Sequence, residues 1–209
     1  MSSPATLWQT VFGNRRPVEI EIGPGRGDVL LAFAAARPDT NFFAIEHAAG
    51  LAEALAAEAA ARGLTNVRVI AGDARCVLGL APPASVATVH VYFPDPWPKT
   101  RHRHRRLFDR QDLADAIARV LVGGGAVHVA TDLPALGERA RASLHAAGLR
   151  EVPARGPTRP VSKFERKYAA AGTWAATFVK EGPTTRRGRA APAGSARPAR
   201  RTPRSRSAP

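Results

Sequence analysis

Acidic side chains recur at the ends of apolar, strand-like segments in the first two thirds of the chain. Five such segments each end in, or are soon followed by, a carboxylate, and these residues are Glu21, Glu46, Asp73, Asp95 and Asp132. Carboxylates accept hydrogen bonds from hydroxyl and amine groups. Because the carboxyl ends of parallel strands share one edge of a sheet, where ligands bind, we expect these five side chains to surround one ligand.

A glycine-rich loop follows the first of these segments. Gly23, Gly25 and Gly27 have the spacing G-x-G-x-G, whereas a dinucleotide-binding loop has the spacing G-x-G-x-x-G. Asp28 comes next, at the start of the following helix, where its charge would repel a pyrophosphate group. The loop therefore suits a cofactor with a cationic or zwitterionic group better than a dinucleotide.

Two carboxylates stand where a nucleoside would need them. Glu46 ends the second strand segment and can accept hydrogen bonds from two ribose hydroxyls, and Asp73 ends the third and can accept one from an adenine amine. With the glycine loop, this pattern resembles class I S-adenosylmethionine-dependent methyltransferases. The resemblance implies S-adenosylmethionine as the cofactor. It also implies a Rossmann-like, doubly wound, mostly parallel α/β sheet with a late antiparallel strand.

A rigid turn and a dense group of cations follow the fourth strand segment. The stretch FPDPWPKTRHRHRR (93–106) has three prolines around Asp95 and Trp97. Five of the eight residues from Lys99 to Arg106 are Lys or Arg. Such cations contact nucleic-acid phosphates and fix the position of the nucleic acid without reading its sequence. The arginines expected on the RNA backbone are Arg101, Arg103, Arg105 and Arg106.

This stretch also admits interpretations other than phosphate binding. The cations could form salt bridges with Asp109 and Asp112 at the start of a helix, although two carboxylates do not neutralise five cations. Trp97 could stack on a base or pack in the core, and both alternatives stay open. His102 and His104 form an H-x-H pair, but the adjacent cations and the lack of a third ligand argue against a metal.

The carboxylates need a scaffold, and the order of segments supplies one. Strand-like and Ala-rich helical segments alternate between residues 18 and 150, which predicts a mostly parallel sheet with helices on both faces. We expect the Gly123–Gly125 run to end the helix predicted over 111–121. The predicted strands are 18–22, 41–46, 67–73, 88–93, 126–131 and 173–180. A short helix is expected after 67–73, and the other predicted helices are 28–36, 50–62, 111–121 and 134–147.

Composition limits the class of protein and its partners. The chain has 209 residues and a formal charge of +14, which favours a polyanionic partner. We expect an N-terminal arm (1–17), a methyltransferase domain (18–180) and a disordered basic tail rich in Arg, Pro and Ala (181–209). The single cysteine, Cys76, cannot form an intramolecular disulfide. No secretion signal or apolar membrane span is evident, so we expect a cytoplasmic protein without membrane contact.

Four segments narrow the resemblance to one family. FGNRRPVEIEIGPGRG, FPDPWPKTRHRHRRL, ATD and RPVSKFERK occur in the order typical of bacterial tRNA (guanine-N7)-methyltransferases, and the similarity covers residues 8–180. The resemblance implies transfer of a methyl group from S-adenosylmethionine to N7 of a guanine in the variable loop of tRNA. Guanine N7 has a free lone pair and no proton to lose, so the reaction depends on placement more than on a base.

The resemblance also assigns residues. Asp95 is implied at the reaction centre, and the implied cofactor-binding residues are Glu21, Gly23, Gly25, Gly27, Glu46, Asp73 and Asp95. The implied substrate-binding residues are Lys99, Asp132, Ser162, Lys163, Phe164 and Glu165, with Ser162 standing where the family has Thr. No metal is expected, and the chain could be a monomer or a homodimer. The alternatives are a non-catalytic RNA-binding protein on the same fold and a methyltransferase with another substrate.

Overall fold

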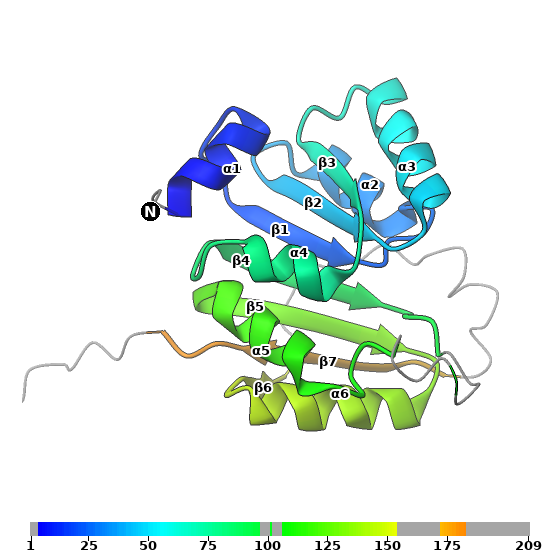
Figure 1. Ribbon diagram of the computed structural model, residues 1–209, viewed down its shortest axis with the longest axis vertical. Helices are drawn as coiled ribbons and strands as arrows, with labels where there is room; N and C mark the ends of the chain where they lie inside the picture. The colour runs from blue at the N-terminus through cyan, green and yellow to red at the C-terminus, as the bar shows by residue number, and fades with distance from the viewer. Residues whose placement is uncertain (1–3, 97–100, 102–105, 154–171, 183–209) are drawn as a thin grey trace, which may run out of the picture.

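The computed structural model describes residues 4–96, 101, 106–153 and 172–182. The described residues form one seven-stranded sheet flanked by helices (Figure 1). The strands are β1 (Val18–Ile22), β2 (Asn41–Glu46), β3 (Val67–Ala71), β4 (Val86–Tyr92), β5 (Leu121–Thr131), β6 (Arg150–Val152) and β7 (Trp174–Val179). The helices are α1 (Pro4–Phe12), α2 (Asp28–Ala36), α3 (Ala49–Ala61), α4 (Ala74–Leu80), α5 (Gln111–Val120) and α6 (Pro134–Ala146).

The sheet has the strand order β3-β2-β1-β4-β5-β7-β6. The first five strands run parallel, and β7 is antiparallel to both β5 and β6. The predicted mostly parallel sheet with a late antiparallel strand is confirmed, whereas the short edge strand β6 was not predicted. The strand order reverses between β1 and β4, so a crevice opens beyond their carboxyl ends. These ends lie on the right in Figure 1.

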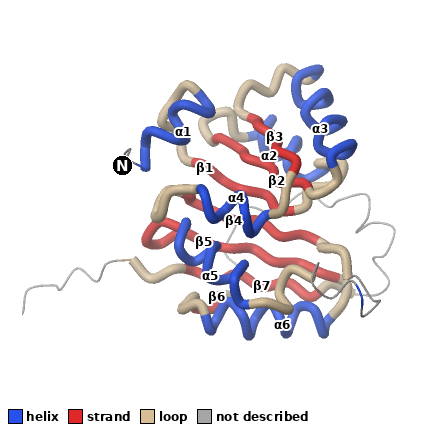
Figure 2. The backbone as a smooth tube through the Cα atoms, viewed as in Figure 1, coloured by secondary structure: helices blue, strands red, loops and turns tan. Residues whose placement is uncertain are grey.

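Helices cover both faces of the sheet, as Figures 1 and 2 show. One face carries α1, α4, α5 and α6, and its core includes Ile20, Val89 and Val127 from the strands. The other face carries α2 and α3, which pack on Phe42 and Ala44 of β2. Because side chains alternate between the two faces of a strand, every second residue of the central strands joins one of these cores.

The N-terminal segment contains a helix that packs on the core. Trp8 and Phe12 of α1 are each 7% exposed and belong to the larger apolar cluster. The indole Nε1 of Trp8 also donates to Ser85 Oγ at 3.0 Å, which ties α1 to the segment before β4. None of the helices in the described ranges is long and apolar enough to cross a membrane.

The triple glycine departs from its prediction. Gly123–Gly125 do not end a helix; α5 already ends at Val120, and the glycines lie inside β5. The register between β4 and β5 jumps here, from Val86 opposite Leu121 to Thr88 opposite Ala126, which is a bulge. A Cβ on Gly125 would lie 2.9 Å from the Val122 carbonyl oxygen, so the close backbone approach requires glycine.

Candidate functional site

A pocket of about 940 Å³ lies beyond the carboxyl ends of the parallel strands. The size falls within the range of pockets that hold small ligands and cofactors, about 300–1,000 Å³. All five carboxylates expected at the strand ends line it, so the fold brings them together around one pocket. They are Glu21, Glu46, Asp73, Asp95 and Asp132.

The glycine loop forms one wall of this pocket. Gly27 has a φ of +76° and begins α2, and a Cβ placed on it would come within 2.2 Å of Leu55 Cδ1 on α3. Glycine is therefore required both by the left-handed backbone and by the close contact with α3. The loop also turns at Gly25, which has a φ of +57° and whose N–H donates to Glu46.

Glu46 binds two backbone segments at once. Its Oε2 accepts the N–H of Gly25 at 3.0 Å, and its Oε1 accepts the N–H of Ala48, at the start of α3, at 2.9 Å. The residue is only 7% exposed. A carboxylate has about four acceptor positions, so each oxygen keeps one for a ligand hydroxyl. The side chain expected to hold the ribose thus also fixes the shape of the glycine loop.

Asp73 caps α4 and is accompanied by a cation that sequence analysis did not identify. Its Oδ1 accepts the N–H of Arg75 at 2.8 Å, and its Oδ2 lies 3.5 Å from Arg75 Nη1. The Arg75 guanidinium also reaches Asp112 and the carbonyl oxygens of Arg106 and Leu107. The only sequence signal was the position of Arg75 two residues after Asp73, because its other partners are more than thirty residues away in the sequence.

The turn after β4 starts from an unusual backbone conformation. Phe93 has a φ of +47°, which is rare for an aromatic residue and costs about 1–3 kcal/mol. Its N–H donates to the Ala130 carbonyl at 2.8 Å, so the neighbouring β5 holds it in place. Pro94 and the exposed Asp95 follow at the pocket edge. The backbone conformation of Phe93 and the fixed φ of Pro94 direct the chain along the pocket, so that Asp95 lies at its edge.

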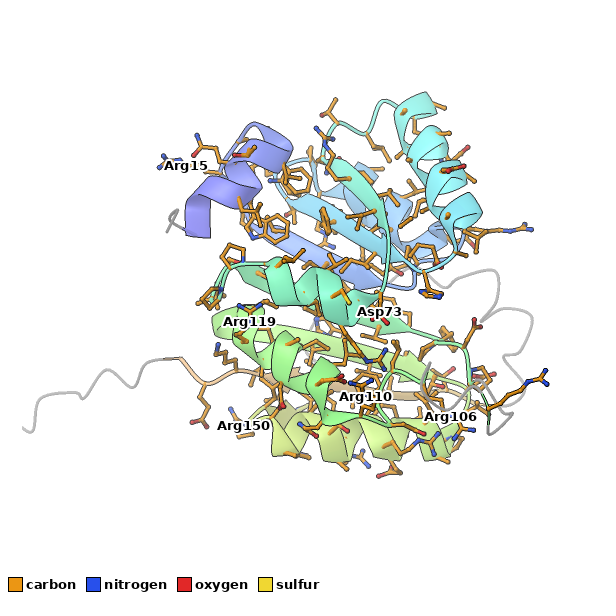
Figure 3. The ribbon with its side chains drawn as sticks, viewed as in Figure 1. Arg15, Asp73, Arg106, Arg110, Arg119 and Arg150 are labelled. Carbon is orange, nitrogen blue, oxygen red and sulfur yellow. The ribbon has the colours of Figure 1, made fainter. Side chains whose placement is uncertain are left out.

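Two carboxylates form ion pairs with arginines near this turn. Asp109 pairs with Arg106 at 3.3 Å and with Arg139 of α6 at 3.0 Å. Asp112, on the first turn of α5, pairs with both Arg75 and Arg110. The salt-bridge alternative therefore holds for Arg106. In Figure 3, Arg106 and Arg110 lie on the side of the sheet where the pocket opens, and Arg119 and Arg150 lie toward the opposite edge.

The charge of the pocket opposes the charge of the chain. Among the described residues, six carboxylates line the pocket, because Asp28 joins the five at the strand ends, against two guanidinium groups, Arg26 and Arg75. The chain as a whole carries +14. An acidic cavity in a basic protein favours a cationic group inside the pocket and a polyanionic partner on the surface outside it. This charge distribution suits the cationic or zwitterionic cofactor that the glycine loop predicted.

A row of polar side chains crosses the sheet beside the pocket. His90 Nε2 lies 2.8 Å from Glu19 Oε2, and its Nδ1 lies 2.8 Å from the hydroxyl of Tyr92, which lines the pocket. The His90 ring stacks on His128 at 5.4 Å, and His128 Nδ1 lies 2.9 Å from Thr177 Oγ1. The sequence pattern alone did not predict this row, because its members come from four different strands.

Burial and charge shift two groups of this row. Burial, with the charge of His90 and a smaller contribution from Arg37, lowers the pKa of His128 to about 4 against the opposing charge of Glu19. Burial alone would raise the pKa of Glu19, but hydrogen bonds and charges from His90 and Arg37 outweigh it and lower that pKa. Arg37 Nη1 lies 2.7 Å from Glu19 Oε1. Glu19 and His128 therefore resist protonation in the folded protein.

Several predicted residues lie outside the described ranges. They are Trp97, Lys99, Arg103, Arg105, Ser162, Lys163, Phe164 and Glu165. Arg101 is described and exposed. Over the ranges that the structure describes, no group of three or more His, Cys, Asp and Glu side chains could hold a metal ion.

Comparison with known proteins gives sequence relatives and structural neighbours. The family model described as "Putative methyltransferase" matches residues 15–176. The tRNA (guanine-N(7)-)-methyltransferase of Hydrogenovibrio crunogenus is 38% identical over 184 residues, which are 83% of this chain and 76% of that protein. The protein of the same name from Leifsonia xyli subsp. xyli is 41% identical over 167 residues, 75% of this chain and 72% of that one.

Solved structures share the fold. The 16S rRNA methyltransferase KamB superposes with a TM-score of 0.63 at 16% identity, over 87% of this chain and 95% of that chain. The aminoglycoside resistance methyltransferase NpmB1 gives a TM-score of 0.60 at 19% identity, over 86% and 94%. At these identities the likeness shows the fold alone.

Proposed function

The chain belongs to the tRNA (guanine-N7)-methyltransferase family, and we propose that it transfers the methyl group of S-adenosylmethionine to N7 of a guanine in the variable loop of tRNA. The acidic pocket at the β1–β4 crevice is the structural observation that carries this proposal. It suits a cofactor with a sulfonium and an ammonium group. The cations beyond Asp95 suit the phosphates of an RNA placed at the pocket mouth.

The residues present fit the cofactor. Glu46 keeps free acceptor positions for ribose hydroxyls, and Asp73 faces the same pocket from the end of β3. Glu21 is 4% exposed at the end of β1 and adds negative charge next to the glycine loop. These side chains bind and orient the nucleoside and the cationic groups. Apolar residues such as Leu107 and Leu133 also line the pocket and offer surface to the uncharged parts of the cofactor.

The reaction requires placement. Bound S-adenosylmethionine supplies a methyl group on a positively charged sulfur, and guanine N7 can accept it with a lone pair that carries no proton. No general base is needed, so the protein acts by holding the two partners in line and by removing water. Such placement is worth roughly 7–11 kcal/mol. Asp95, held by the Phe93–Pro94 turn, is the carboxylate that we assign to the junction of cofactor and target base.

Methylation of a defined tRNA tests the proposal. An unmodified tRNA transcript is incubated with the protein and methyl-labelled S-adenosylmethionine, digested to nucleosides and analysed by mass spectrometry. We expect 7-methylguanosine, and cleavage of the tRNA at the modified base should map it to the variable loop. A transcript with that guanine replaced by adenine, and 16S ribosomal RNA, serve as controls. Label in another nucleoside, or only in ribosomal RNA, would contradict the proposal.

The proposal also covers the partner, the location and the assembly of the protein. We propose that it binds tRNA, acts in the cytoplasm, and is a monomer or a homodimer. Sedimentation of the full chain with and without tRNA would measure the assembly directly. The basic tail (181–209), of which residues 183–209 lie outside the described ranges, is proposed to add affinity for RNA without sequence preference.

A further inference from the structure

Arg75 connects the cofactor side of the pocket with the end of the basic stretch. Its side chain is 12% exposed; Nε and Nη2 donate hydrogen bonds, and Nη1 forms an ion pair. Nη1 lies 3.5 Å from Asp73 Oδ2, and Nε lies 3.2 Å from Asp112 Oδ1. Nη2 donates to the carbonyl oxygen of Arg106 at 2.9 Å and approaches that of Leu107 at 3.4 Å. A partly buried guanidinium with this many partners fixes its neighbours relative to one another.

The segment that Arg75 holds is the downstream anchor of the basic stretch. Arg106 is the last cation of the stretch, and Leu107 lines the pocket and packs on the core. Phe108 follows and is 4% exposed, with its carbonyl accepting from Ser143 Oγ at 3.2 Å. The upstream anchor is the Phe93 turn at the end of β4. Both ends of the stretch are thus attached beside the pocket, and Arg75 provides the attachment to a cofactor carboxylate.

We propose that Arg75 is a positioning residue that sets the end of the basic stretch relative to the bound cofactor, so that RNA held by the cations presents its target base in line with the methyl group. The inference deepens the proposed function and rests on it. Arg75 does not have to touch the base or the RNA. It acts through Asp73 on one side and through the Arg106 and Leu107 carbonyls on the other.

An Arg75→Lys variant tests the proposal. The lysine keeps the charge, but a single ammonium cannot reach Asp73, Asp112 and the two carbonyls together. Misplacement of about 1 Å costs on the order of 100-fold in rate, so we expect kcat for tRNA methylation to fall about 10- to 100-fold. The dissociation constants for S-adenosylmethionine and tRNA should each change less than about threefold. An unchanged kcat, or a loss explained by weaker cofactor binding, would overturn the proposal.

Arg119→Lys is the matched control. Arg119 Nη2 also donates to backbone carbonyls of the same helix region, those of Leu78 and Ala81, but at the opposite end of α4 (Figure 3). We expect a comparable loss of thermal stability in both variants and loss of kcat in Arg75→Lys alone. If both variants lose kcat equally, the effect is one of stability and the positioning role is wrong.

A second variant covers the case in which Arg75→Lys does not fold. Asp112→Ala removes the acceptor of Arg75 Nε and leaves the guanidinium contacts to the Arg106 and Leu107 carbonyls. We expect kcat to fall by a smaller factor, with cofactor affinity unchanged. A wild-type kcat in Asp112→Ala together with an unfolded Arg75→Lys would contradict the proposal.

Hydrogen exchange separates this proposal from the proposed function. In the full-length protein, peptides that contain residues 106–110 should exchange faster in Arg75→Lys than in the wild type or in Arg119→Lys. This measurement needs no methylation activity. If the wild type makes no 7-methylguanosine, the proposed function fails, whereas equal exchange in all three proteins refutes the role of Arg75.

Discussion

The carboxylate of Glu46, at the end of β2, accepts the backbone N–H of Gly25 at 3.0 Å, so one side chain fixes the glycine loop that follows β1. The same side chain lines the pocket and accepts the N–H of Ala48 at the start of α3. The shape of the loop therefore depends on the same carboxylate that we propose to bind the cofactor. Replacing Glu46 should therefore change both the stability of the glycine loop and the affinity for the cofactor.

Glu46→Gln should weaken cofactor binding by at least about tenfold and destabilise the fold by about 1–3 kcal/mol. The amide has one acceptor oxygen, so its NH2 group must face the N–H of Gly25 or of Ala48. Calorimetric titration with S-adenosylmethionine and urea denaturation measure the two effects. Glu53→Gln, on the exposed surface of α3, is the control. Wild-type affinity in Glu46→Gln would refute the binding role of Glu46.

Asp95→Ala should abolish methylation and leave the fold intact. Asp95 is exposed at the pocket edge, and removal of an exposed side chain changes stability by less than about 0.5 kcal/mol. Mass spectrometry of tRNA nucleosides measures activity, and thermal denaturation measures stability. Asp39→Ala, an exposed aspartate just before β2 at the opposite edge of the sheet, should retain full activity. Activity near that of the wild type in Asp95→Ala would remove Asp95 from the reaction centre.

Gly27→Ala should destabilise the fold by about 2–4 kcal/mol. An alanine here would have to keep the left-handed backbone conformation, with a φ of +76°, and its methyl group would overlap Leu55 Cδ1. Urea denaturation measures the loss. Gly50→Ala is the matched control, because Gly50 lies in the first turn of α3 with no atom within 4 Å of an added Cβ. Equal stability of the two variants would show that the loop can move away from α3.

Stability should fall as the pH decreases from about 6.5 to 4. Burial lowers the pKa of His128 to about 4, so the unfolded chain takes up a proton in this range while the folded protein does not. The sign follows because proton uptake stabilises only the unfolded state, and the loss is roughly 2–3 kcal/mol. Below this range, protonation of Glu19, whose pKa is also lowered, removes further stability.

Urea denaturation between pH 4 and 8 measures this dependence. A His128→Asn variant has no titrating ring and should show a flatter profile between pH 6.5 and 4. Thr177→Val removes the hydroxyl partner of His128 and leaves the ring in place, so it should lower stability while keeping the slope. The explanation would be wrong if His128→Asn kept the slope of the wild type.

The local pattern of the sequence was enough to predict most of the elements, though not α1 or β6, and the side of the sheet that carries the pocket. Alternation of strands and helices predicted α2 and β2 at their observed bounds, and the five strand-end carboxylates do share the pocket. This worked because residue periodicity sets each element, and parallel connection brings all carboxyl ends to one edge. The triple glycine failed as a helix terminator, because glycine serves a bulge as readily as a helix end.

Only the tertiary structure decided which side chains contact each other within that edge. Arg75 reaches carbonyls 31 and 32 residues away, and His90 meets Glu19 across 71 residues. Such contacts depend on the order of strands in the sheet and on how far each side chain extends from its strand or helix. Neither can be inferred from the spacing of residues along a short segment. The sequence thus determined what chemistry the pocket can perform. The packing of the chain determined which residues hold its parts in place.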